Sequence, residues 1–86
     1  MIVYKIFVLY EVTESLKHIP IRYRRKILNF IETLKQNPFE EGEFVEVDLK
    51  GNTYQAKIIG KYALYYFVDD AVKEIKIVDL LDADKA

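Results

Sequence analysis

Lysine and tyrosine side chains on two neighbouring segments are the residues whose types and spacing could do chemistry. Both segments, Thr53–Ile59 and Tyr62–Val68, are rich in apolar and aromatic residues, which is typical of β-strands. Side chains alternate between the two faces of a strand, so one face must cover the core and the other is left exposed. We expect the exposed face to display a set of residues drawn from Lys50, Lys57, Lys61 and Tyr65.

Tyrosine beside lysine is compatible with three kinds of surface. The first kind binds RNA, because bases stack on aromatic rings and phosphates pair with cations. The second kind equally binds a peptide that wraps the sheet, since exposed apolar area marks protein contacts. The third interpretation is ordinary tyrosine packing, with lysine stems lying along an apolar surface. The residues alone leave all three open.

A second group of candidate residues is basic and lies within one helical segment. It consists of Arg22, Arg24, Arg25 and Lys26. This cluster is either a solvated helix face or a surface that contacts phosphates or an acidic partner, and the two interpretations carry equal weight. The formal net charge of −1 argues mildly against nucleic acid, because proteins that rely on phosphate contacts usually show a basic surplus.

Other catalytic and metal-binding arrangements are nearly absent. The chain has no cysteine, which excludes a thiolate zinc site and a cysteine nucleophile. Its one histidine, His18, precedes Ile19-Pro20 and is expected to lie at a helix C-terminus, where an imidazole favours the helix dipole. Alternation sends Glu46 and Asp48 to the solvent side of a strand, and no loop has the ligand spacing of a calcium site. We therefore expect neither a metal nor a cofactor.

Two helices are expected in the first half of the chain, after a buried strand over residues 2–9. Thr13 is the expected N-cap of a short helix that ends near Lys17. Pro20 can serve as the first residue of a second helix, and Asn37-Pro38 stops it, because the residue before proline avoids helical backbone angles. Apolar residues at spacings of three and four mark the buried stripe of this helix: Tyr23, Ile27, Phe30, Ile31 and Leu34.

Near Gly42 the apolar period changes from helical to two. Strands are predicted over residues 45–49, 53–59, 62–68 and 73–80, with two-residue turns at Gly51-Asn52 and Gly60-Lys61. The segment from Tyr62 to Val68 is apolar on both sides, as expected of a central strand. Helices grouped before a run of hairpins imply an α+β fold: an N-terminal strand, a two-helix hairpin, then an antiparallel meander of three to four strands, with the helices on one face.

Length and composition bound the domain organisation. A chain of 86 residues suits one domain spanning 1–86. No apolar run approaches membrane-spanning length, and Met1–Tyr10 is interpreted as a strand rather than a signal peptide. The absence of cysteine fits a reducing cytoplasm.

Most of the chain resembles the RelE/ParE toxins. Leu49-Lys50-Gly51 resembles that family's leucine-glycine turn, and Tyr54-Gln55-Ala56-Lys57 stands where the family has a strand of the kind Tyr-Arg-x-Arg. After the glycine turn at Gly60, the segment Tyr62-Ala63-Leu64-Tyr65 matches Tyr-Arg-x-x-Tyr, and Asp69-Asp70 matches an acidic turn. Upstream, Leu34-Lys35-Gln36-Asn37-Pro38 is similar to the end of the family's second helix.

This resemblance implies the toxin of a type II toxin–antitoxin module, neutralised by an antitoxin protein that wraps it. RelE-like members cleave mRNA at the ribosome without a metal, whereas ParE-like members inhibit DNA gyrase. Under the RelE-like hypothesis Lys57 and Lys61 stabilise phosphate charge, and Tyr65 stacks on a base or assists proton transfer. Further contacts to RNA are then expected from Lys50, Arg22, Arg25 and Lys26.

Departures from the pattern keep a second hypothesis open. Gln55 and Ala63 stand where the family has arginines, and the acidic and apolar segment Val78–Asp82 stands where it has a C-terminal arginine and tyrosine. Lysine lacks the bidentate fork of arginine, so Lys57 and Lys61 replace these groups only in part. The alternative is a non-catalytic protein of the same fold: a ParE-like gyrase inhibitor, or a protein-binding or dimerisation domain that forms homo-oligomers.

Overall fold

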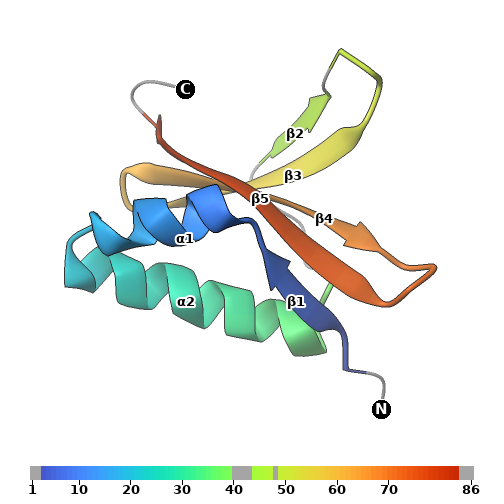
Figure 1. The fold of residues 1–86 in the computed structure, drawn as a ribbon, viewed down its shortest axis with the longest axis horizontal. Coiled ribbons are helices and arrows are strands. Elements are labelled where there is room, and N and C mark those ends of the chain that lie inside the picture. Colours follow the sequence, from blue (N-terminus) through green and yellow to red (C-terminus); the bar gives the residue numbers. More distant parts are fainter. Residues whose placement is uncertain (1–2, 40–43, 48, 84–86) are drawn as a thin grey trace.

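Two helices pack against one face of a five-stranded sheet (Figure 1). This computed structural model describes residues 3–39, 44–47 and 49–83. Strands and helices follow one another in the order β1 (Lys5–Val8), α1 (Tyr10–Lys17), α2 (Ile21–Gln36), β2 (Phe44–Val47), β3 (Thr53–Ile59), β4 (Tyr62–Asp69) and β5 (Glu74–Asp82). The predicted α+β architecture is confirmed.

The sheet is mixed, with strand order β1-β5-β4-β3-β2. The hairpins β2–β3, β3–β4 and β4–β5 are antiparallel, as predicted, and β1 pairs parallel to β5. The α1–α2 hairpin carries the chain from β1 to β2 at the opposite edge of the sheet, and the antiparallel meander then brings β5 beside β1. β4 is the central strand, which explains why its sequence is apolar on both sides. A register shift at Tyr65/Tyr66 marks a β-bulge in the β4–β5 pairing.

The helices bury the apolar stripes that their spacing predicts. In α2 the buried residues are Ile27, Ile31 and Leu34, with Tyr23 and Phe30 partly buried against the same core. The helix ends at the C-cap Asn37, directly before Pro38. His18 is the C-cap of α1; its backbone N–H donates to the Ser15 carbonyl, and that of Ile19 donates to the Leu16 carbonyl. The helix-terminal position predicted for this histidine is confirmed.

The predicted start of the first helix is wrong. Thr13 lies inside α1, which begins at Tyr10 with Leu9 as N-cap. The backbone N–H groups of Val12 and Thr13 both donate to the Leu9 carbonyl, so the first turn forms without a side-chain cap. The earlier start lets Val12, which is 1% exposed, reach the core as a helical residue.

One of the two predicted tight turns is confirmed. Ile59 pairs with Tyr62, so Gly60 and Lys61 alone connect β3 to β4. Between β2 and β3 the last pair is Val47 with Thr53, which makes this connection longer than the predicted Gly51-Asn52 turn. Leu49 and Lys50 lie in the turn itself, and Gly51 follows it with φ +86°. The side chains of Glu46 and Asp48, predicted on the solvent side, lie outside the described part of the chain.

An ion pair and a tyrosine attach the start of β1 to the β4–β5 turn. Lys73 Nζ lies 2.8 Å from Asp70 Oδ1, and the Tyr4 hydroxyl donates a hydrogen bond to the same carboxylate oxygen. The backbone N–H of Lys5 donates to the Lys73 carbonyl at 3.0 Å. The hydrogen bond from Lys73, and then that from Tyr4, lowers the pKa of Asp70.

We expect this contact to make stability depend on acid pH. A carboxyl group with a lowered pKa in the folded state stabilises the protein above its unfolded pKa of about 3.9, and this contribution is lost as the pH falls through the lower folded value. Asp70→Asn should therefore reduce the loss of melting temperature between pH 5 and pH 2, as measured by circular dichroism. Asp79→Asn, on an exposed carboxyl, is the control, and an unchanged pH profile in Asp70→Asn would contradict the expectation.

Candidate functional site

The sheet register separates two of the residues predicted to act together. Lys57 pairs with Leu64, whose side chain is in the core beneath the helices, whereas Tyr65 pairs with Ala56. Adjacent residues of a strand point to opposite faces, so Lys57 lies on the helix side and Tyr65 on the face away from the helices. The expectation that both belong to one exposed face is therefore wrong. The predicted two-residue turn at Gly60-Lys61 already implies this separation, because it pairs Ile59 with Tyr62 and therefore Lys57 with Leu64. What the local pattern does not say is which of the two faces the helices cover.

Two aromatic pairs join α2 to the sheet on the helix side. The rings of Tyr23 and Tyr62 meet edge to face with centroids 5.5 Å apart. Those of Phe30 and Tyr66 do the same at 5.7 Å. Seven residues separate Tyr23 from Phe30, which places the pairs about 10 Å apart along one side of α2.

Cations lie over the rings of these pairs. The guanidinium carbon of Arg22 is 4.8 Å from the centre of the Tyr23 ring, and its Nη2 donates to the Tyr23 hydroxyl at 3.4 Å. The ammonium groups of Lys61 and Lys57 lie 5.8 Å from the Tyr62 ring and 5.6 Å from the Phe30 ring. We call this set the α2–β3 surface: Arg22, Tyr23, Phe30, Lys57, Lys61 and Tyr62. It brings together cations from both predicted groups.

The remaining candidate cations are distributed differently. Lys26 follows Tyr23 by three residues and precedes Phe30 by four, so it lies on the same side of α2 and is exposed. Arg25 is two residues from Tyr23, which turns it about 200° around the helix and away from the sheet. Lys50 lies in the β2–β3 turn. The four-residue basic cluster of the sequence is thus divided by the helical period.

The aromatic members of this surface were not predicted as site residues. Tyr23 and Phe30 were assigned to the apolar stripe of the second helix, and they do pack on the core as partly buried residues. The one sequence signal for them is that two aromatic residues stand seven positions apart in a helix, next to basic residues. This signal alone does not predict the site, because the cations over Tyr62 and Phe30 come from the β3–β4 hairpin.

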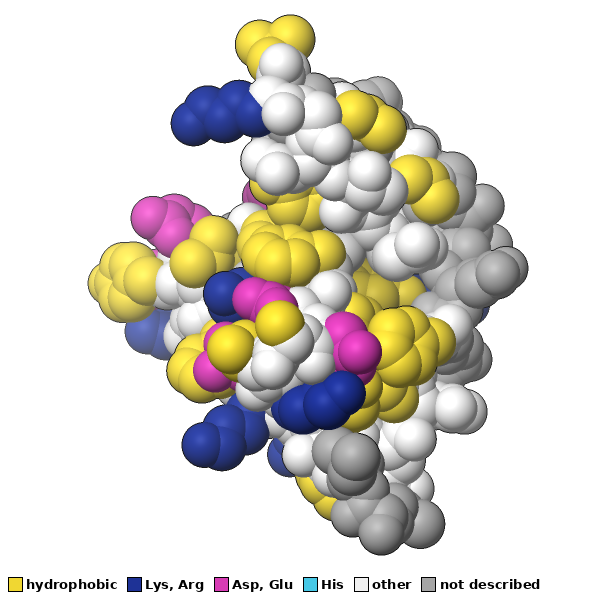
Figure 2. Space-filling model, turned by 90° about the vertical axis from the view of Figure 1, so that its right-hand side faces the viewer, with side chains coloured by type: hydrophobic (Ala, Val, Ile, Leu, Met, Phe, Trp, Pro, Cys, Tyr) yellow, Lys and Arg dark blue, Asp and Glu magenta, His cyan; other side chains and the backbone are white. Residues whose placement is uncertain are grey.

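The two faces of the sheet differ in how their charges are neutralised. In the described part of the chain, neither Arg22 nor Lys61 forms an ion pair, and the first turn of α2 has no acidic residue. On the open face, Lys76 lies 3.7 Å from Asp69 and 3.8 Å from Glu74. Figure 2 views the molecule from the β4–β5 turn and shows charges of both signs among hydrophobic side chains, with a hollow below the β2–β3 turn at the top. The α2–β3 surface is therefore the better site for an anion.

The open face, away from the helices, combines rings with balanced charge. Phe7, Lys76 and Phe67 are paired across β1, β5 and β4, and Phe67 meets the Tyr54 ring at 5.7 Å. Lys76 Nζ lies 5.6 Å over the Phe67 ring. Tyr65 belongs to this face, paired with Asp79 of β5. Such a surface is suited to an apolar or mixed-charge polypeptide rather than to a polyanion.

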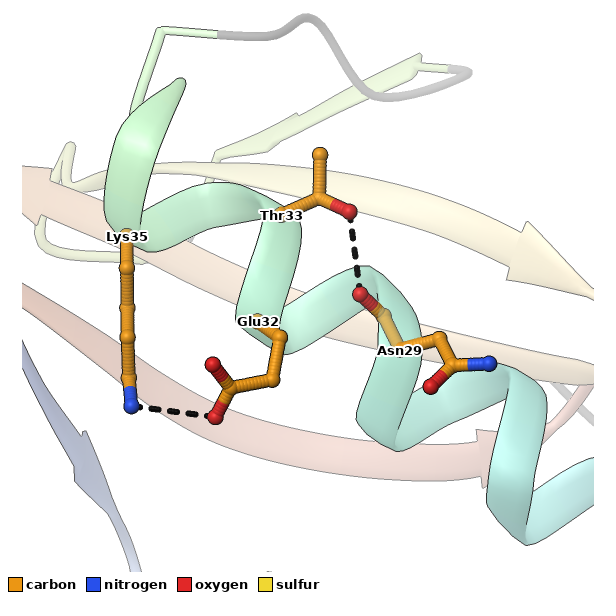
Figure 3. Close-up of polar contacts among 4 residues, drawn as sticks. All are labelled: Asn29, Glu32, Thr33 and Lys35. Atoms are coloured by element: carbon orange, nitrogen blue, oxygen red, sulfur yellow. Dashed lines mark hydrogen bonds and ion pairs between the residues drawn. The ribbon is translucent and has the colours of Figure 1, made fainter.

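The outer side of α2 has a depression of about 530 Å³, lined by Glu32, Thr33, Gln36 and Asn37. Two of its lining residues are engaged within the helix, as Figure 3 shows: Lys35 binds Glu32 at 3.0 Å, and the Thr33 hydroxyl donates to the Asn29 carbonyl at 3.0 Å. The described residues include no group of three or more acidic or histidine side chains that could hold a metal ion, and no helix among them is long and apolar enough to cross a membrane.

Comparison with solved structures relates the fold to RelE toxins. The chain superposes with a TM-score of 0.81 on a chain of the archaeal RelE–RelB complex from Pyrococcus horikoshii OT3, at 22% identity, covering 98% of this chain and 99% of the other. For the toxin–antitoxin complex RelBE2 from Mycobacterium tuberculosis the TM-score is 0.71, at 21% identity over 93% of this chain and 98% of the other. No family model and no curated protein sequence matches the chain. The protein thus has a RelE-like fold.

Proposed function

We propose that the protein is the toxin of a toxin–antitoxin module and inhibits translation by ribosome-dependent cleavage of mRNA in the cytoplasm. The fold it shares with chains of RelE–RelB complexes supports the class. The observation that carries the RNA target is the α2–β3 surface, where Arg22, Lys57 and Lys61 gather over aromatic rings. Cations held in place before the ligand arrives suit a phosphodiester backbone.

The cations have a direct role in this reaction. In this reaction a ribose 2′-hydroxyl loses its proton and attacks the neighbouring phosphate, and the bond to the 5′-oxygen of the next nucleotide breaks as that oxygen takes up a proton. Negative charge builds up on the phosphate oxygens in between, and fixed cations stabilise it. Lys57 is assigned this role, and Arg22, Arg25, Lys26, Lys50 and Lys61 bind RNA on either side of it. Tyr65 is on the other face, so its part in stacking or proton transfer requires RNA to pass around the sheet edge. Tyr65→Phe tests proton transfer alone, because it removes the hydroxyl and keeps the ring that would stack on a base.

An antitoxin is the proposed protein partner. One of the similar solved structures is a toxin–antitoxin complex by name, and another is a RelE–RelB complex. The open face, with Phe7 47% exposed and its cation Lys76 neutralised by acids, is the surface that fits a polypeptide. The ribosome and its mRNA are the proposed targets of the α2–β3 surface, on the helix side of the sheet.

Induced expression in bacteria tests the proposal. The wild-type chain is expected to arrest growth and to leave cleaved mRNA 5′ ends that primer extension maps to translated codons. Lys57→Ala should restore growth and reduce cleavage at least tenfold, because one preorganised charge contact contributes about 2–3 kcal/mol to the transition state. Lys35→Ala, which removes an equally charged residue paired with Glu32 on the same helix, is the control and should remain toxic.

A non-catalytic function is favoured by one observation. Ala63 stands where the resembling family has an arginine. This alanine is fully buried, so position 63 contributes no cation to the surface. Growth arrest with intact mRNA would reject cleavage and select this alternative. A gyrase supercoiling assay then separates a ParE-like inhibitor from a protein-binding or dimerisation domain, and light scattering of the purified chain shows whether it forms homo-oligomers.

A further inference from the structure

We propose that Arg22 and Lys61, fixed by the rings of Tyr23 and Tyr62, form a phosphate-binding subsite for single-stranded RNA that is separate from Lys57. This inference rests on the proposed function and goes further, because it assigns a distinct part of the surface to backbone binding and not to chemistry.

Contacts at this end of the molecule form an unbroken series. The Arg22 guanidinium lies over the Tyr23 ring, the Tyr23 ring meets the Tyr62 ring edge to face, and the Lys61 ammonium lies over the Tyr62 ring. The two cations are far apart in the sequence, and the β3–β4 turn brings them to the same pair of rings. Gly60 permits this approach, since it has φ +62° and a Cβ there would lie 2.5 Å from Tyr23 Cδ1.

The ligand is the phosphate backbone rather than the bases. Both rings already contact a cation and each other, so they orient the cations instead of offering a free face for stacking. Holding a long side chain in place beforehand lowers the entropy lost on binding. Arg22 and Lys61 are exposed and form no ion pair among the described residues, so no acid has to be displaced.

Position relative to Lys57 makes the subsite distinct. Lys57 lies over Phe30, seven residues further along α2 than Tyr23. This corresponds to about 10 Å along the helix, and it places Lys57 over a different ring pair from the one that holds Arg22 and Lys61. A strand of RNA along α2 would meet the Arg22–Lys61 pair at one end and Lys57 further on.

Salt dependence of RNA binding tests the subsite. The purified full-length chain is titrated with a fluorescein-labelled single-stranded RNA oligonucleotide at several salt concentrations. Each phosphate contact contributes about 0.7 to the slope of log K against log salt concentration. Arg22→Gln and Lys61→Gln should each lower this slope by about 0.7 and weaken binding about fivefold at 0.1 M salt, while Lys35→Gln leaves the slope unchanged.

The outcomes separate this inference from the proposed function. If both variants bind RNA as tightly as the wild type and with the same salt-dependence slope, the subsite is overturned and the proposed function still stands. Polyglutamate that displaces the RNA at equal charge concentration would also overturn it, in favour of an acidic peptide ligand. Growth arrest without mRNA cleavage in the wild type counts against the proposed function, whatever the slopes.

Discussion

Replacing Tyr66 by alanine is expected to lower the free energy of unfolding by about 3–5 kcal/mol. Tyr66 has no exposed surface, belongs to the core cluster and meets the Phe30 ring edge to face at 5.7 Å. The substitution removes the ring, its contact with α2 and the support beneath Lys57. A loss of this size is a large part of the 5–15 kcal/mol that ordinarily separates folded from unfolded domains. Urea unfolding followed by circular dichroism measures it.

The neighbouring tyrosine supplies the control. Tyr65 precedes Tyr66 in β4 and points to the open face, where it is only partly buried. Tyr65→Ala removes the same atoms and should cost about 1 kcal/mol. If the two variants lost equal stability, or if Tyr65→Ala lost more, the assignment of the two faces of β4 would be incorrect, and with it the separation of Tyr65 from Lys57.

This pair of tyrosines also shows how far the sequence could predict the fold. The two-residue period after Gly42 identified the hairpin strands, and the stripe of α2 identified its buried side, because both patterns are local. In the resulting architecture, β4 is central and the helices cover one face. What a two-residue period cannot give is the choice of face in a strand that is apolar on both sides. That choice depends on which side the helices cover, and it decided where Lys57 and Tyr65 lie.

Connections were harder to predict than elements for a related reason. Gly60-Lys61 forms a two-residue turn, and Gly51-Asn52, which has the same appearance in the sequence, does not. The difference is tertiary: the first turn is short because Ile59 and Tyr62 pair in the middle of the sheet, against α2. β2 is an edge strand with its one partner in β3, so fewer contacts fix where the pairing ends.

The candidate site could be predicted in its charges but not in its arrangement. Lys57, Lys61 and Arg22 were all identified from the sequence as candidate cations. Their assembly over Tyr23, Phe30 and Tyr62 depends on the contact between α2 and the β3–β4 hairpin, which joins segments far apart in the chain. Consecutive residues on a helix point about 100° apart, so Arg25 separates from Lys26 for geometric reasons alone.

Gly60→Ala is expected to destabilise the protein by about 2–5 kcal/mol, the sum of two separate costs. A residue with a Cβ at the left-handed φ of +62° costs about 1–2 kcal/mol. The new methyl group also overlaps the Tyr23 ring, 2.5 Å from its Cδ1 atom, and overpacking of this kind costs about 1–3 kcal/mol. The ring cannot move freely, because it packs against Tyr62 and Arg22. Chemical denaturation of purified protein gives the free energy directly.

Gly51→Ala isolates the backbone contribution. Gly51 also has a left-handed φ, +86°, but a Cβ there would meet no atom within 4 Å, so about 1–2 kcal/mol is expected. A third variant completes the comparison, since in a Tyr23→Ala background the cost of Gly60→Ala should fall to the Gly51→Ala value. Equal costs at Gly60 and Gly51 in the wild-type background would mean that the Tyr23 ring does not rest on the β3–β4 turn. The contact that brings Lys61 towards Arg22 would then be absent, and the phosphate subsite would lose its physical basis.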